Sequence, residues 1–233
     1  FHPLGVEFAP AVCIGIDAVA VHPQGLAVVS ADHHDDEIDL GFLGEHLRNQ
    51  GYDTVETREP GGTPLAEKIR SLLLDRADEP VAPETEAFLV LAARRQHVAQ
   101  VIEPALARGS IVLCDRFIDS TLAYQGYARG LDIATLERLN RLATHALMPD
   151  LTLVFDLPVS TGLARRRSAA ELNRLDRESL RFHRSVRTGF LDLAKRHPTR
   201  IKVLSARASK ETVAHAVARV VTPMLGHIRR GVD

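Results

Sequence analysis

Two apolar segments, Ile111 to Cys114 and Leu151 to Leu157, constrain the fold of this chain more than any other feature. Both are nearly continuous apolar runs bounded by polar residues, without the alternation expected of a half-exposed strand. Such runs are typical of strands buried on both faces of a sheet. A helix is predicted over residues 132–146, between them. Buried strands that alternate with helices form a parallel sheet with helices on both faces, so we expect an α/β fold.

Glycine, proline and the spacing of apolar residues predict the other elements. Leu40, Leu43 and Leu47 recur at helical spacing, and Gly51 follows as a left-handed stop. Thr63 followed by Pro64 predicts the start of another helix. The remaining predicted elements are a strand over 54–57, a helix from Pro83 past His97 that kinks near Pro104 and ends by Gly109, helices over 177–197 and 210–225, and a strand over 201–204.

The charge balance and the cysteines exclude several classes of protein. With 29 basic and 30 acidic residues the net charge is -1, which indicates neither a nucleic-acid partner nor binding to an anionic membrane. No apolar run approaches the roughly 18 residues of a membrane span, and Phe1 to Pro10 lacks the pattern of a signal peptide. We therefore expect a cytoplasmic protein. Cys13 and Cys114 are far apart, which predicts two reduced thiols rather than a zinc ribbon or a disulfide framework.

Residues 1–38 differ in kind from the rest of the chain. We expect an atypical N-terminal segment over 1–38 and one folded domain over 39–228. Residues 32–37 read Asp-His-His-Asp-Asp-Glu, and both residue types can bind transition metals. Adjacent side chains of one loop rarely converge on one ion, so we interpret this run as a solvated charged loop.

Charged residues follow two of the predicted strands, at the edge where open α/β sheets bind ligands. The segment Thr57 to Thr63 reads Thr-Arg-Glu-Pro-Gly-Gly-Thr, in which Arg58 can pair with a phosphate and the glycines allow close approach of the backbone. Asp115 and Arg116 follow the buried strand at 111–114, where a phosphate with Mg²⁺ would satisfy both charges. A surface loop in the first case and a mutual ion pair in the second are the alternatives.

Groups that recognise a base and a sugar occur in two further places. Arg94 lies one helical turn beyond Val90, so the two share a face of the helix after Pro83. Residues 120–126 read Ser-Thr-Leu-Ala-Tyr-Gln-Gly and place hydroxyl, aromatic and amide groups together. Each residue alone could be a cap or a surface residue, but their order along the chain favours a site.

Together these motifs, with Pro149-Asp150-Leu151-Thr152-Leu153, make the chain from about Leu43 to its C-terminus resemble the thymidylate kinase family. The resemblance implies a three-layer P-loop nucleoside-monophosphate-kinase-like fold with a central parallel sheet. It also implies a homodimer that transfers the γ-phosphoryl group of ATP to dTMP with Mg²⁺. A kinase for another nucleoside monophosphate fits these motifs less well.

The resemblance also assigns roles to individual residues. The acceptor phosphate would be held by Arg58 and Arg116, and Asp115 would act near Mg²⁺. The arginine run at 165–167, continuing to Arg174 and Arg177, resembles the lid over the donor phosphates, or else it is a solvated helix face. The full set is Asp115, Arg116, Arg165 and Arg167 for catalysis, with Asp115 at the metal, and Asp17, Arg58, Val90, Arg94, Thr121, Tyr124 and Gln125 for substrate binding.

The chain departs from the family at the phosphate-binding loop. The pattern G-x-x-x-x-G-K-[ST] is absent, and the first lysine is Lys68. Without that loop the β and γ phosphates of ATP lose their main anchor, so the alternative function is a catalytically impaired dTMP-binding or interaction protein. Either residues 26–30 form the first strand and the charged run replaces the loop, or residues 13–17 do. We prefer the second alignment, in which Gly15-Ile16-Asp17 resembles the Gly-Ile-Asp that precedes the loop in the family.

A frameshift is one hypothesis for this departure. Codons for Gly-Ser-Gly-Lys-Ser-Thr, after two single-base deletions, encode Ala-Val-Ala-Val-His-Pro, which is the sequence of residues 18–23. Resequencing the gene tests it, and an intact frame that encodes these residues refutes it.

Overall fold

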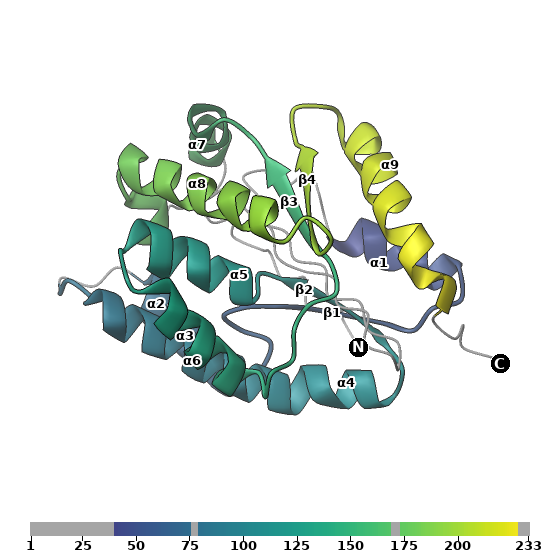
Figure 1. Ribbon diagram of the computed structural model, residues 1–233, viewed down its shortest axis with the longest axis horizontal. Coiled ribbons are helices and arrows are strands. Elements are labelled where there is room, and N and C mark those ends of the chain that lie inside the picture. Colours follow the sequence, from purple (N-terminus) through teal and green to yellow (C-terminus); the bar gives the residue numbers. More distant parts are fainter. Residues whose placement is uncertain (1–39, 76–78, 169–172, 228–233) are drawn as a thin grey trace.

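The computed structural model describes residues 40–75, 79–168 and 173–227 (Figure 1). The α-helices are α1 (Leu40–Asn49), α2 (Pro64–Leu74), α3 (Pro83–His97), α4 (Glu103–Ala107), α5 (Ile118–Thr121), α6 (Ile133–Ala143), α7 (Val159–Ser168), α8 (Leu180–Arg196) and α9 (Lys210–Val221). The strands are β1 (Thr54–Arg58), β2 (Ile111–Asp115), β3 (Thr152–Asp156) and β4 (Ile201–Ser205). Two π-helical segments, η1 (Val98–Ile102) and η2 (Leu122–Ala128), and two 3₁₀ segments, η3 (Leu175–Arg177) and η4 (Thr222–His227), complete the order.

The strands form two parallel pairs. β1 pairs with β2 in a register that sets Thr54 opposite Ile111 and Arg58 opposite Asp115. β3 pairs with β4, with Thr152 opposite Ile201. Parallel pairing brings the carboxyl ends of β1 and β2 to one edge. Arg58 and Asp115, each the last residue of its strand, are therefore neighbours.

Helices cover both faces of the strands, which confirms the predicted α/β fold. On one face, α1 and α9 pack on alternate side chains of β2 and β3, including Ile111, Leu113 and Leu153 (Figure 1). On the other face, Val112 and Cys114 of β2 pack with η1, α4 and the residues after β2. Val154 of β3 packs there with η2 and α8. Both strand pairs thus share the core beneath α1 and α9, and the described residues form three layers.

Local sequence signals account for several helix boundaries. Thr63 caps α2 as predicted, because its Oγ1 accepts a hydrogen bond of 3.2 Å from the amide of Ala66. The helix that was predicted to be broken or kinked near Pro104 is interrupted by the π turn η1 before Pro104. Pro104 has no amide hydrogen to continue the α-helical pattern, and π turns are a known accommodation of such a break.

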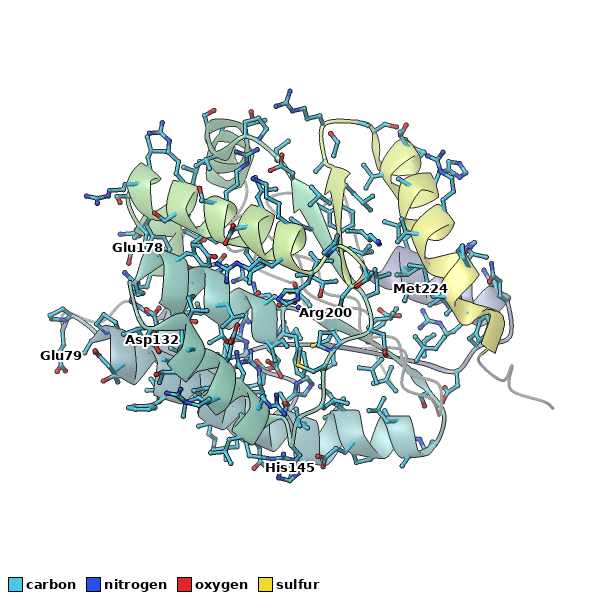
Figure 2. The ribbon with its side chains drawn as sticks, in the orientation of Figure 1. Glu79, Asp132, His145, Glu178, Arg200 and Met224 are labelled. Atoms are coloured by element: carbon cyan, nitrogen blue, oxygen red, sulfur yellow. The ribbon has the colours of Figure 1, made fainter. Side chains whose placement is uncertain are left out.

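A buried ion pair ties α5 to the β3–β4 pair. Asp119 is 0% exposed and receives hydrogen bonds of 2.5 and 2.6 Å from the two terminal nitrogens of Arg200. Arg200 also donates to Thr152 at the start of β3, and it lies near the centre of the molecule (Figure 2). This contact fixes the segment that follows β2 against the other strand pair.

Several predictions concern residues outside the described ranges. They include the N-terminal segment 1–38, Asp17 and Cys13. The division into 1–38 and 39–228 therefore stays a prediction. Within the described ranges, no helix combines the length and the apolarity that crossing a bilayer requires.

Candidate active site

A pocket opens at the carboxyl edge of β1 and β2, and six of the predicted substrate-contacting residues line it. It lies between the turn after β1, helices α2 and α3, and the segment from Arg116 to η2. Among its lining residues are the predicted Val90, Arg94, Arg116, Thr121, Tyr124 and Gln125, joined by Glu59, Pro60, Arg70, Leu73, Leu74, Glu86, Ser120, Arg174 and Leu175.

Arg94 is fixed in the wall of this pocket and is only 1% exposed. Its Nε donates to Oε2 of Glu59 at 2.7 Å, and its Nη1 donates to Thr121 and Asn140 at 2.8 and 2.5 Å. Its Nη2 donates to the carbonyl of Phe117 at 2.9 Å. Four of the five N–H groups of the guanidinium are therefore used by the protein within the described chain, which leaves one on Nη2 for a ligand.

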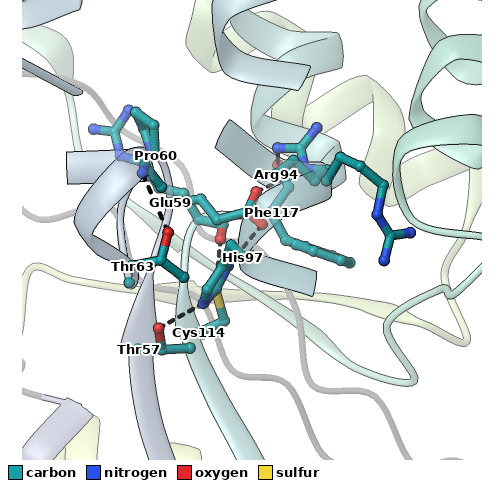
Figure 3. Close-up of polar contacts among 12 residues, drawn as sticks. Thr57, Glu59, Pro60, Thr63, Arg94, His97, Cys114 and Phe117 are labelled. Carbon is teal, nitrogen blue, oxygen red and sulfur yellow. Dashed lines mark hydrogen bonds and ion pairs between the residues drawn. The ribbon is translucent and has the colours of Figure 1, made fainter. Parts of the chain in front are cut away.

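Glu59 joins Arg94 to a second buried residue, His97 (Figure 3). His97 Nδ1 lies 3.0 Å from Oε1 of Glu59, and its Nε2 lies 2.6 Å from Oγ1 of Thr57. Because a carboxylate only accepts hydrogen bonds, Nδ1 is the donor, and in the neutral ring Nε2 accepts from the Thr57 hydroxyl. Gly62 lies against this pair, since a Cβ there would approach His97 Cδ2 to 2.5 Å. The network therefore holds the turn after β1 on α3.

Three arginines gather at the edge of the pocket. Arg58 donates to Glu67 at 2.9 Å, and Arg70 donates to the carbonyl of Pro60 at 3.0 Å. Arg116 adopts a left-handed backbone conformation, with a φ of 64°, directly after β2. Burial, together with the positive charges of Arg58 and Arg116, lowers the pKa of Arg70 to about 10. An anion bound here would relieve this repulsion between like charges.

Aromatic and aliphatic side chains form the rest of the pocket. Tyr124 is 3% exposed and makes edge contacts with Phe182 and Phe190 of α8. The guanidinium of Arg116 stands 4.9 Å from the centre of the Tyr124 ring. Val90 of α3 is half-buried in the lining. These side chains place an apolar part of the lining next to a cationic edge, which suits an aromatic ring joined to an anionic group.

Arg174 belongs to this pocket, although the sequence pattern grouped it with the predicted lid. Its Nη2 donates to Oε2 of Glu86 at 2.7 Å and its Nε to the carbonyl of Leu73 at 2.8 Å. These contacts fold residue 174 back onto α2 and α3. Arg165 and Arg167 lie on α7, but their side chains are outside the described part, as is Asp17.

Sequence reasoning missed four of the lining residues that carry charge: Glu59, Arg70, Glu86 and Arg174 as a pocket residue. Arg58 is the opposite case, because it pairs with Glu67 beside the pocket and does not line it. One signal for Arg70 was available, since it lies near the middle of the helix that begins at Pro64, on the edge where Arg58 and Arg116 were expected. The carboxylates gave no such signal because their partners are distant in sequence.

The fold and this pocket define an α/β protein with a site for a phosphorylated small molecule at the carboxyl edge of parallel strands. The sequence model of the thymidylate kinase family matches residues 40–217. The chain is 54% identical to thymidylate kinase of Thermomicrobium roseum over 190 residues, which cover 81% of this chain and 90% of that protein. It is 50% identical to thymidylate kinase of Pseudomonas putida strain W619 over 188 residues, with 81% and 91% covered.

A solved structure agrees with these relatives. The fold resembles the crystal structure of thymidylate kinase from Ehrlichia chaffeensis with a TM-score of 0.61 and 32% sequence identity, covering 78% of this chain and 86% of that chain. The chain belongs to the thymidylate kinase family. The predicted family and the predicted P-loop nucleoside-monophosphate-kinase-like fold are thereby confirmed.

Proposed function

We propose that this chain transfers the γ-phosphoryl group of ATP to dTMP and forms dTDP. The observation that carries the proposal is the pocket itself. It sets the arginine cluster of Arg70 and Arg116, flanked by Arg58, beside a wall that contains Arg94 and Tyr124. Phosphoryl transfer depends on positioning and on neutralisation of charge, and this arrangement supplies both without a nucleophilic side chain.

The acceptor, dTMP, spans both parts of the pocket, with its phosphate at the arginines and its base at the wall beside them. The phosphate of dTMP is held by Arg70 and Arg116, and Arg58 adds charge from beside Glu67. The thymine ring lies between Val90 and the segment of Thr121, with the free N–H of Arg94 directed to a carbonyl oxygen of the base. The hydroxyl-bearing sugar lies near Tyr124, between phosphate and base.

Mg²⁺ fits Asp115, the last residue of β2, because Glu59 and Glu86 of the pocket lining are already paired with arginines. No group of three histidine, cysteine or acidic residues within the described ranges could hold a metal ion by itself. Mg²⁺ is commonly bound by one or two carboxylates together with substrate phosphates, so Asp115 at the end of β2 would suffice when ATP is present. The ion would neutralise charge on the transferred phosphoryl group, while Arg165 and Arg167 would cover the donor phosphates from α7.

Calorimetric titration with dTMP and, separately, with ATP and Mg²⁺, followed by a dTDP assay on the same sample, tests the proposal. Binding of both with turnover supports it. Binding of dTMP without ATP, and without turnover, would instead support the impaired dTMP-binding protein that the missing lysine-containing loop suggests. Failure to bind dTMP refutes both. The cytoplasmic location and the lack of a nucleic-acid partner stay predictions.

Replacing Val90 by phenylalanine is expected to raise the affinity for dTMP about 5-fold. Valine gives the base an apolar contact without stacking, whereas an aromatic pair is worth about 1 kcal/mol beyond the area it buries. Calorimetric titration of Val90→Phe with dTMP measures the gain. Val203→Phe, at an exposed position on β4, is the control and should leave the affinity unchanged. An equal affinity in both variants would show that Val90 does not face the base.

We also propose that the chain forms a homodimer through α2, α3 and α6, which lie side by side in Figure 1. These helices expose four large apolar side chains: Leu65 (51%), Leu72 (65%), Phe88 (61%) and Leu142 (72%). Apolar side chains gathered on adjacent helices mark an interaction surface, and a two-fold dimer would cover the same surface on both copies.

Phe88→Glu is expected to give a monomer at concentrations where the unaltered chain is a dimer, because it would bury two carboxylates in the interface. Sedimentation velocity measures the two masses. Phe42→Glu is the matched control, since Phe42 is 53% exposed on α1, away from this surface (Figure 1). A Phe88→Glu variant that sediments like the Phe42→Glu control would contradict the proposed interface.

A further inference from the structure

The side-chain amide of Gln125 is held from one side by Glu86. Its Nε2 donates to Oε1 of Glu86 at 2.8 Å, and both residues line the pocket. Glu86 lies on α3 and is 1% exposed, whereas Gln125 lies on η2 and is 4% exposed. The contact therefore joins the two elements that enclose the base-binding part of the pocket, and water has little access to it.

Glu86 can only accept hydrogen bonds in this setting. Arg129 donates to both of its oxygens, at 3.2 and 3.0 Å, and Arg174 donates to Oε2 at 2.7 Å. Burial by itself would raise the pKa of Glu86, but the hydrogen bonds from Arg129 and Arg174 lower it below its ordinary value. Glu178, which lies near the start of α8 (Figure 2), forms an ion pair with Arg129 at 2.6 Å. The carboxylate is therefore ionised and its position is fixed by two cations.

An ionised carboxylate determines which way the neighbouring amide faces. Only the NH₂ group of Gln125 can point to Glu86, because the amide oxygen would be repelled. The oxygen Oε1 of Gln125 is then turned away from Glu86, and no residue in the described ranges donates a hydrogen bond to it. In this pocket it is a fixed acceptor without a protein donor, which is the state expected of a group that awaits a donor on a ligand.

We propose that Glu86 is a positioning residue that locks the Gln125 amide with its oxygen toward the nucleobase, and thereby selects a pyrimidine with a hydrogen on N3. The inference rests on the proposed function, since it takes the pocket to hold a pyrimidine nucleoside monophosphate. Thymine and uracil carry N3–H, a donor that matches Oε1. Cytosine has a lone pair on N3, which a fixed acceptor repels. Glu86 itself needs no contact with the substrate.

Binding of dUMP and dCMP tests the proposal, because both lack the 5-methyl group and differ only at positions 3 and 4. Calorimetric titration is used, so that the result does not depend on ATP. The unaltered chain should prefer dUMP to dCMP by about 100-fold or more. In Glu86→Gln, residue 86 can donate as well as accept, so Gln125 can turn over. The preference should then shrink by about 10-fold or more.

Arg129→Gln is the matched control. It removes two hydrogen bonds from Glu86 but leaves the contact with Gln125, and Arg129 does not line the pocket. A role for Glu86 in stability alone predicts that both variants weaken dUMP and dCMP binding equally. The proposal predicts that the ratio of the affinities for dUMP and dCMP changes in Glu86→Gln but not in Arg129→Gln. If Glu86→Gln does not fold, Glu86→Asp is the second variant. Aspartate keeps the negative charge next to Arg129 and Arg174, but its shorter side chain withdraws the carboxylate from Gln125. The preference for dUMP over dCMP should then also become smaller.

The outcomes separate this inference from the proposed function. A folded variant at position 86 with an unchanged ratio of affinities overturns the inference while the function stands. Equal binding of dUMP and dCMP by the unaltered chain, with dTMP still bound, does the same. Failure of the unaltered chain to bind dTMP overturns the proposed function and the inference with it.

Discussion

Replacement of Arg116 by methionine is expected to lower kcat/KM for dTMP phosphorylation by about 10³-fold, the order found when an arginine that stabilises a transferred phosphoryl group is removed. Arg116 follows the last residue of β2, and its left-handed backbone turns the chain at the pocket edge. It acts together with Arg70, whose pKa it helps to lower. Without Arg116, Arg70 is the one arginine of the proposed pair that still holds the acceptor phosphate.

The melting temperature of Arg116→Met separates a loss of function from unfolding. The substitution removes a like charge that lowers the pKa of Arg70 and also removes the contact with the Tyr124 ring, so Tm is expected to change little. The methionine keeps an apolar side chain beside Tyr124. Arg116→Lys should be intermediate in activity, because lysine keeps the charge but not the planar fork that binds two phosphate oxygens.

Arg48→Met is the control for Arg116→Met. Arg48 lies on α1, outside the pocket lining, and pairs with Glu56 while 48% exposed. Exposed ion pairs contribute little to stability, so this variant should keep both kcat/KM and Tm. Steady-state assays over a range of dTMP concentrations and thermal unfolding measure the two quantities. An Arg116→Met variant that keeps kcat/KM within about 10-fold would be too active for a residue that holds the acceptor phosphate.

The strands were predictable almost to the residue, and for β2 and β3 the reason is that burial on both faces leaves a continuous apolar run. The predicted strand at 111–114 is β2, Ile111–Asp115, and the predicted strand at 201–204 is β4, Ile201–Ser205. Helix ends were less predictable. α6 ends at Ala143 rather than near 146, because His145 and Ala146 take left-handed backbone conformations that no glycine announced.

The π-helical turn η2 was also beyond the sequence pattern. Residues 120–126 were treated as one stretch of ligand-binding groups, without a predicted element, and η2 covers Leu122–Ala128. These residues pack against α8, through the ring of Tyr124 on Phe182 and Phe190, and such contacts between distant segments leave no local pattern. The spacing of apolar residues along a sequence indicates that a helix is present. It does not show where one turn of that helix widens from the α to the π form.

The site was predictable where its residues are consecutive in the sequence and not where they meet only in the fold. Thr121, Tyr124 and Gln125 were found because they stand together. Glu59 and Glu86 were missed because each is held by side-chain partners 35 or more residues away, such as Arg94 for Glu59. A buried carboxylate in a folded protein needs such partners, but a glutamate in a sequence is on average exposed.

Glu59→Gln is expected to have the largest effect on stability, a loss of about 3–5 kcal/mol in the free energy of unfolding. Glu59 and Arg94 are each 1% exposed and are joined at 2.7 Å. Glutamine keeps the size of the side chain but removes its charge, so Arg94 remains as a buried cation whose other partners, Thr121, Asn140 and a carbonyl, are neutral. Denaturant unfolding followed by circular dichroism measures the loss.

Glu56→Gln makes the same chemical change at an exposed ion pair. Glu56 and Arg48 are 32% and 48% exposed, so water screens both charges and the expected loss is about 0–1 kcal/mol. The difference between the two variants isolates the effect of burial on one substitution. A Glu59→Gln variant as stable as Glu56→Gln would mean that Arg94 does not depend on a buried counter-charge.

The double variant Glu59→Gln with Arg94→Met separates the structural use of this pair from its use in binding. Removing both partners of a buried ion pair is far less costly than removing one, because no unpaired charge is left behind. The double variant should therefore be more stable than Glu59→Gln alone, as denaturant unfolding will show. Its affinity for dTMP should be lower than that of the unaltered chain, because the one N–H of Arg94 left for a ligand is gone. Stability regained without affinity would show that Glu59 supports the fold by balancing a charge that the pocket needs for its substrate.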